Sequence, residues 1–139
     1  MKPRILSFRI LGCLAMLAGL SNVAATPAGA ATVVALGASN TYGKGVARSQ
    51  AFPAQLETIL RAKGLAVRVV NAGINGDATE GMLRRLDGAV PSGTSAVILQ
   101  PNNVFRGLPH QPDGQHLTPE GYHMVAEHLA AQVAGAIGR

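Results

Sequence analysis

The 139-residue chain is poor in residues that several common kinds of site require. It has one cysteine and no tryptophan, and aromatic residues make up only 4% of it. A single cysteine excludes a disulfide framework within the chain and any all-cysteine metal site. Charged residues make up 14% and apolar residues 47%, which excludes a disordered acidic tail and a coiled coil. The length is that of one domain.

The apolar run at 10–20 is too short to cross a bilayer comfortably, so the sequence does not predict a transmembrane helix there. This run is preceded by basic residues and followed by small ones: Lys2, Arg4 and Arg9, then 23–25 and 28–30. These three parts in this order are typical of a secretory signal peptide. We therefore expect residues 1–25 to be removed, with cleavage as late as residue 30. A membrane anchor or a buried N-terminal helix is the alternative.

Most of the excess positive charge lies in this leader. Lys and Arg number 12 against 7 acids, a formal net charge of +5. Removing Lys2, Arg4 and Arg9 leaves 9 basic residues against the same 7 acids. We therefore expect a secreted or periplasmic protein with no nucleic-acid partner and no stable membrane insertion after cleavage. A secreted basic binding module is a further interpretation of this composition.

From residue 31 onward, strand patterns alternate with helix patterns. Short apolar runs predict buried strands at 32–36, 66–70 and 95–99, and loops rich in Gly, Asn or Pro follow two of them, at 71–76 and 100–115. A first helix is predicted at 51–63. A second, which Asp77 or Thr79 could cap, carries Met82, Leu83 and Leu86. A third begins at Thr118, and its apolar face consists of Met124, Val125, Leu129 and Val133. This alternation predicts an α/β fold in which helices cover a parallel sheet.

In such sheets, ligands bind where strands end and helices begin. Ser39 stands there, in Gly37-Ala38-Ser39-Asn40 after the first predicted strand. A hydroxyl on a glycine-flanked turn before a helix can be a nucleophile, with backbone N–H groups nearby to hold an oxyanion. An ordinary serine turn is the alternative. Gly73 and Gly76 bracket the turn after the second strand, where backbone geometry alone can require glycine.

Asp113 and His116 stand three residues apart, directly before the last predicted helix. A histidine that acts as a base needs an acidic partner, which fixes its tautomer and stabilises its protonated form. A surface loop with an unrelated acid and histidine is the alternative. With His110 the pair would make three ligands spaced by threes, but a zinc site needs three or four converging ligands. We therefore expect no metal here.

Taken together, these segments resemble the SGNH (GDSL-like) hydrolases, and most of all their secreted bacterial arylesterase, thioesterase and lysophospholipase type. The stretches that carry the resemblance are 33–44, 70–79 and 113–129. The most specific one begins Asp113-Gly114-Gln115-His116-Leu117-Thr118-Pro119. The resemblance implies a flavodoxin-like three-layer α/β/α sandwich. It also implies hydrolysis of carboxylic ester or thioester bonds of small acyl substrates, without a cofactor or metal.

The resemblance also assigns roles to particular residues. Ser39 would be the nucleophile, His116 its general base and Asp113 the acid that orients the histidine. The backbone N–H groups of Ser39 and Gly76 would hold the oxyanion. Asn102 or Asn103 would be the third donor.

The chain departs from the family pattern in two places. Ala38 stands where the family has Asp, and no Gly-x-Asn-Asp follows the third predicted strand. About one βα unit is therefore missing, which places a deletion between 100 and 102 in an SGNH-hydrolase-like domain at 31–139. The alternative function is that of a degenerate relative that only binds acyl or glycan ligands. Loss of the unit should leave an apolar sheet edge exposed, from which we expect self-association.

Overall fold

The computed structural model describes residues 29–138, so the signal peptide expected at 1–25 lies outside the described residues. Strands β1 (Ala31–Gly37), β2 (Val67–Gly73) and β3 (Ala96–Leu99) form a parallel sheet in the order β2-β1-β3. This order is the beginning of the flavodoxin-like order 2-1-3-4-5. The sequence therefore predicts the three strands and their parallel arrangement, although not the full length of β2.

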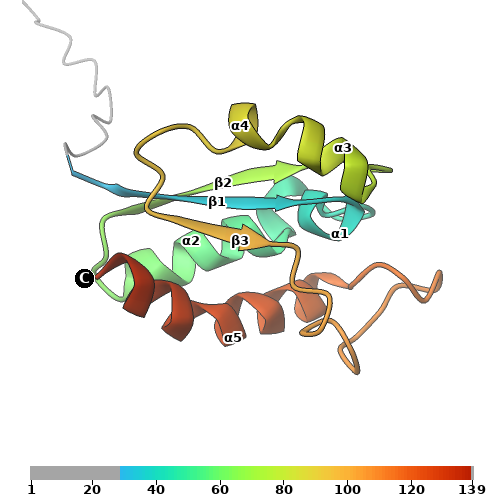
Figure 1. Cartoon of the computed structure of the whole chain (residues 1–139). Coiled ribbons are helices and arrows are strands. Elements are labelled where there is room, and N and C mark those ends of the chain that lie inside the picture. Colours follow the sequence, from blue (N-terminus) through green and yellow to red (C-terminus); the bar gives the residue numbers. More distant parts are fainter. Residues whose placement is uncertain (1–28, 139) are drawn as a thin grey trace, which may run out of the picture.

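Helices cover both faces of the sheet (Figure 1). One face carries α2 (Phe52–Ala62) and α5 (Pro119–Ile137), and the other carries α3 (Thr79–Arg84) and α4 (Leu86–Ala89). The predicted three-layer α/β/α sandwich is thus confirmed. None of the helices between residues 29 and 138 is long and apolar enough to cross a membrane.

The core lies between the sheet and the α2–α5 layer. Val33 and Ala35 of β1 are fully buried against it. The helices supply the larger core side chains: Phe52, Leu56 and Leu60 from α2, and Tyr122, Val125, Leu129 and Val133 from α5. These residues recur every three or four positions, so each helix turns one apolar face inward. Met124, which the sequence places on that face of α5, is instead 41% exposed.

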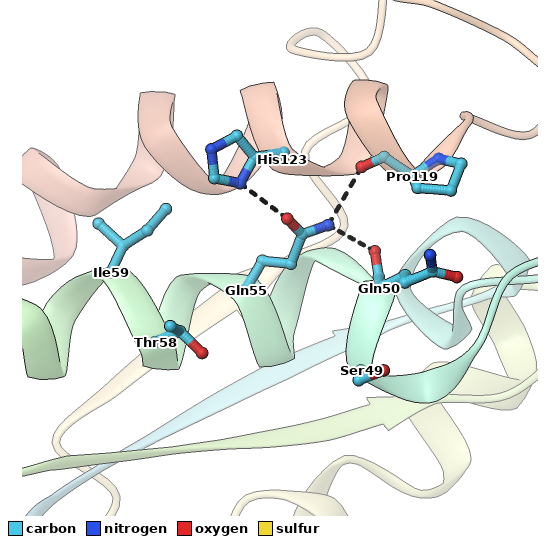
Figure 2. A pocket seen from close by; sticks show the side chains of 7 residues that line it. All are labelled: Ser49, Gln50, Gln55, Thr58, Ile59, Pro119 and His123. Atoms are coloured by element: carbon cyan, nitrogen blue, oxygen red, sulfur yellow. Dashed lines mark hydrogen bonds between the residues drawn. The ribbon is translucent and has the colours of Figure 1, made fainter.

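A polar contact joins the first turns of the two core helices (Figure 2). The amide Nε2 of Gln55 donates to the carbonyl oxygens of Gln50 and Pro119, at 2.6 and 3.1 Å, and Gln55 Oε1 lies 2.7 Å from His123 Nδ1. Gln50 ends the short 3₁₀ helix η1 (Arg48–Gln50). A cavity of about 350 Å³ lies beside this contact. The contact fixes the start of α5, and therefore also the loop that leads into it.

Two predictions about the middle of the chain are wrong. Residues 71–73, predicted as loop, continue strand β2, because Gly37 and Gly73 still pair across the ladder. A Cβ at Gly73 would collide with the backbone of Tyr42, so glycine allows this close approach. The single helix predicted after Asp77 is two short helices, α3 and α4, and neither has a side-chain cap.

The outer edge of β3 is bare. Val97 is 46% and Leu99 is 66% exposed, and no strand of the described part of the chain pairs beyond β3. From Gln100 the chain runs as irregular loop to Thr118 and then directly into α5. The apolar edge expected to be exposed is exposed, whereas the self-association expected from it stays a prediction.

Candidate active site

Two loops bring the predicted triad together at the carboxyl end of the sheet. Ser39 begins α1 (Ser39–Tyr42), directly after β1, and His116 lies just before α5. Ser39 Oγ is 2.9 Å from His116 Nε2, although the two residues are 77 positions apart. His116 Nδ1 is 2.6 Å from Asp113 Oδ2. The three side chains thus form one continuous hydrogen-bonded row.

The carboxylate of Asp113 is tied to its own loop. Besides the imidazole contact, Asp113 Oδ1 accepts the backbone N–H groups of His116 and Gln115, at 3.0 and 2.9 Å. The His116 N–H contributes most, followed by the His116 side chain, to a pKa of Asp113 held well below its usual range. A carboxylate that stays ionised favours the imidazole tautomer with a proton on Nδ1. Nε2 is then free to accept the Ser39 hydroxyl proton.

Burial differs along this row. The side chain of His116 is 6% exposed and that of Asp113 is 44% exposed. The imidazole therefore lies in a shielded setting, in which its hydrogen bonds are stronger than in water. The carboxylate at the rim keeps its charge because backbone N–H groups and partial hydration both stabilise it.

Gln100 fixes the turn that carries Ser39, and the sequence gives no signal for this role. Its Oε1 accepts the Ala38 N–H at 2.7 Å and the Thr41 hydroxyl at 3.4 Å. A Cβ on Gly37 would collide with Thr41 and Gln100, so only glycine fits before this turn. The residue that follows β3 thus holds Ala38, which replaces the aspartate of the family pattern.

A second contact, which the sequence does not predict, joins α1 to the loop that carries His116 and to α5. Asn40 Nδ2 donates to the carbonyl oxygen of Gln115 at 3.1 Å, and the Tyr122 hydroxyl donates to Asn40 Oδ1 at 3.0 Å. Tyr122 is fully buried, and burial raises its pKa to about 12. Its hydroxyl therefore stays a donor at neutral pH. The one sequence signal for this contact is that Tyr122 lies in the first turn of the helix after His116. A buried tyrosine hydroxyl needs a hydrogen-bond partner, and at this position the partner must come from a neighbouring segment.

The expected oxyanion donors lie on two sides of the site. Gly76 has a φ of +80° in the exposed turn after β2. Asn102 and Asn103 are exposed in the loop after β3, and Asn102 Oδ1 accepts from Gln100 Nε2 at 2.9 Å. Asn102 is thus linked through Gln100 to the turn that carries Ser39. The oxyanion roles of these residues stay predictions.

His110 does not join the row. Its Nδ1 lies 2.6 Å from the carbonyl oxygen of Leu108. Across residues 29–138, no three His, Cys, Asp or Glu side chains come together in a way that could hold a metal ion.

No protein-family model matches the chain, and neither does any curated protein. Among solved structures it is similar to AlinE4, an SGNH-hydrolase family esterase, at 29% identity and a TM-score of 0.47 over 76% of this chain and 56% of that chain. It is also similar to TesA, at 29% identity and a TM-score of 0.46 over 77% and 56% of the two chains.

A third similar structure is a lipolytic protein of the G-D-S-L family from Desulfitobacterium hafniense DCB-2. It shares 19% identity at a TM-score of 0.44, over 76% of this chain and 53% of that chain. The chain thus spans about half the length of the solved proteins that it resembles. AlinE4 is described as an SGNH-hydrolase family esterase and the Desulfitobacterium protein as a member of the G-D-S-L family.

Proposed function

We propose that the chain is an exported serine hydrolase of the SGNH type, which cleaves carboxylic ester or thioester bonds of small acyl substrates. The observation that carries this proposal is the hydrogen-bonded row from Ser39 Oγ through His116 to Asp113, with distances of 2.9 and 2.6 Å. A serine within hydrogen-bond reach of a histidine, itself oriented by a carboxylate, is the arrangement that activates a hydroxyl for acyl transfer.

The first half of the reaction forms an acyl-enzyme. Ser39 Oγ attacks the acyl carbonyl carbon while His116 Nε2 takes the hydroxyl proton. Asp113 stabilises the resulting imidazolium. The carbonyl oxygen becomes an oxyanion, held by the N–H groups of Ser39 and Gly76 and by a third donor, Asn102 or Asn103. The tetrahedral intermediate collapses when His116 gives its proton to the departing alcohol or thiol.

The second half regenerates the enzyme. Water attacks the acyl carbonyl, and His116 Nε2 takes a proton from that water. The same donors hold the second oxyanion, and the C–O bond to Ser39 breaks as His116 returns the proton to its Oγ. Activated aryl and short acyl esters suit this site, because a good leaving group demands least of the oxyanion donors.

Replacement of Ser39 tests the proposal directly. Ser39→Ala should lower hydrolysis of a p-nitrophenyl ester of a short acid by at least about a thousand-fold, because it removes the nucleophile. Ser49→Ala is the matched control, since Ser49 is an exposed serine of η1 that lines the cavity beside Gln55. Hydrolysis by Ser39→Ala at the parent rate would remove Ser39 from the mechanism.

Covalent labelling supplies a readout that does not depend on turnover. A fluorophosphonate ester should phosphonylate Ser39 in the parent and in Ser49→Ala, but not in Ser39→Ala. Mass spectrometry of the digested protein locates the adduct. An adduct on another serine, with Ser39 unmodified, would contradict the proposal.

Binding of acyl ligands without turnover is the second candidate function. It is favoured by an apolar cavity of about 390 Å³ lined by residues of β3, α3 and α4. The cavity is lined mainly by aliphatic side chains: Leu36, Met82, Leu83, Leu86, Val97 and Leu99. Saturable binding of a fatty acid that Leu83→Asp weakens, with no Ser39-dependent hydrolysis, would favour this function. Ser39-dependent hydrolysis would favour the esterase.

A further inference from the structure

The guanidinium of Arg85 binds three separate parts of the active-site edge. Arg85 lies between α3 and α4, and its side chain is 22% exposed. Its Nε is 2.8 Å from Asp77 Oδ2. Its two terminal nitrogens donate to the carbonyl oxygens of Ala72, at 2.8 Å, and Gly37, at 2.9 Å. Every nitrogen of the group therefore has a partner.

The three partners lie in the two segments that carry the proposed backbone oxyanion donors, Ser39 and Gly76. Gly37 lies two residues before Ser39, and Asp77 directly follows Gly76. Ala72 is at the end of β2, where this strand pairs with β1. A guanidinium is planar and its N–H directions are fixed, so three simultaneous bonds also fix the spacing of the groups that accept them.

The turn that carries Gly76 has few other supports. Ile74 N–H donates to the carbonyl oxygen of Gly37 at 3.1 Å, and Asp77 N–H donates to that of Ile74 at 3.2 Å. The other carboxylate oxygen of Asp77 accepts the Ala78 N–H at 3.0 Å, and a Cβ at Gly81 would collide with this carboxylate. The far end of the turn is thus anchored through the Asp77 carboxylate, and Arg85 connects that carboxylate to β1.

We propose that Arg85 is a positioning residue, which sets the distance between the N–H groups of Ser39 and Gly76 so that both reach one oxyanion. The proposal rests on the proposed function. The charge of Arg85 is offset by Asp77, and each of its three side-chain nitrogens already donates to Asp77 or to a backbone carbonyl. Arg85 therefore acts through the geometry of the two loops and does not bind the substrate.

The decisive variant keeps the positive charge but removes the planar guanidinium, which makes three hydrogen bonds at once. Arg85→Lys should lower kcat by about 100-fold, as expected when a donor is displaced by a fraction of an ångström or lost. KM should stay within about three-fold, because ground-state binding uses other contacts. The pH profile should keep its shape, because Arg85 has no contact with His116 or Asp113. Arg84→Lys, at the exposed last residue of α3, is the matched control and should stay within about two-fold.

A purely structural role would lower the melting temperature and the folded fraction, but not kcat per folded molecule. Rates are therefore normalised to sites titrated with fluorophosphonate, at temperatures well below unfolding. A normalised kcat for Arg85→Lys equal to that of Arg84→Lys would overturn the proposal. A loss confined to KM would also overturn it.

Backbone amide NMR separates this proposal from the esterase proposal. In Arg85→Lys, the Ser39 and Gly76 amide resonances should both shift, while those of the α2–α5 core stay in place. Unchanged Ser39 and Gly76 resonances would overturn the positioning role, whether or not the parent is active. If the parent shows no Ser39-dependent hydrolysis, the proposed function fails, and these resonances still decide whether Arg85 holds the two loops.

Discussion

The central strand, β1, and one of the two outer strands, β3, have similar apolar sequences but very different surroundings. Residues 33–36 of β1 are at most 2% exposed, whereas in β3 Val97 is 46% and Leu99 is 66% exposed. β1 has a strand on each side and helices on both faces, and β3 has one strand neighbour. Apolar composition alone therefore does not bury a strand; its neighbours do.

The candidate site depends mainly on the well-packed region, which is formed by β1, β2, α2 and α5. Ser39 follows β1, Gly76 follows β2, and His116 precedes α5, which packs on α2. The region around β3 contributes Gln100, through its bond to the Ala38 N–H. The hydrogen-bonded row of Ser39, His116 and Asp113 is therefore intact although the edge of β3 is exposed. The geometry of the site does not require that this edge be covered.

The largest expected effect comes from a substitution in the hydrogen-bonded row itself. Asp113→Asn should lower kcat/KM by about a thousand- to ten-thousand-fold, because an amide no longer fixes the His116 tautomer or stabilises the imidazolium. Steady-state kinetics with a p-nitrophenyl ester measures the loss. Asp87→Asn, an exposed carboxylate of α4, should leave the rate unchanged. A loss below ten-fold in Asp113→Asn would show that the carboxylate is dispensable.

Truncation of one side chain in each region compares their packing directly. Phe52→Ala removes a fully buried core side chain and should lower the free energy of unfolding by about 3–5 kcal/mol. Leu99→Ala, at a side chain that is already two-thirds exposed, should cost about 0.5 kcal/mol or less. Urea denaturation measures both. Equal losses would mean that the β3 edge is covered in solution.

The pKa of Tyr122 predicts how the well-packed region responds to alkali. Burial raises this pKa to about 12 from an ordinary value of 10.0, so the folded state favours the neutral phenol. The resulting stability is complete below pH 10 and is lost as pH rises from 10 to 12. Melting temperatures over this interval should therefore fall more steeply in the parent than in Tyr122→Phe. Parallel curves would exclude Tyr122 as the group responsible.

The smallest expected effect on the folded chain comes from charging the bare edge. We expect the parent to self-associate through β3, and Leu99→Lys to reduce this association with little change in stability, because a lysine at an edge disfavours pairing with another chain. Sedimentation velocity over a range of concentrations measures it. Arg106→Lys, in the exposed loop, is the control. A parent that stays monomeric at every concentration would contradict the expectation.

Sequence reasoning succeeded where the relevant interactions are local. The Asp113–His116 pair spans three residues, and Thr118 accepts the Gly121 N–H at 3.2 Å, as a helix cap predicted from its position would. It failed for the single helix after Asp77. There Arg85 reaches back to the sheet, and the chain breaks into two short helices at that residue.

The sequence by itself determined the alternation of strands and helices, the order of Ser39, Asp113 and His116, and the short-range geometry of the last two. The tertiary structure alone decided the 2.9 Å contact between Ser39 and His116, the support from Gln100 and Arg85, and the exposure of β3. The physical reason is the distance along the chain over which each kind of interaction acts. Backbone propensity and capping act over a few residues, whereas contacts across 48 to 77 positions exist only after the helices have packed on the sheet.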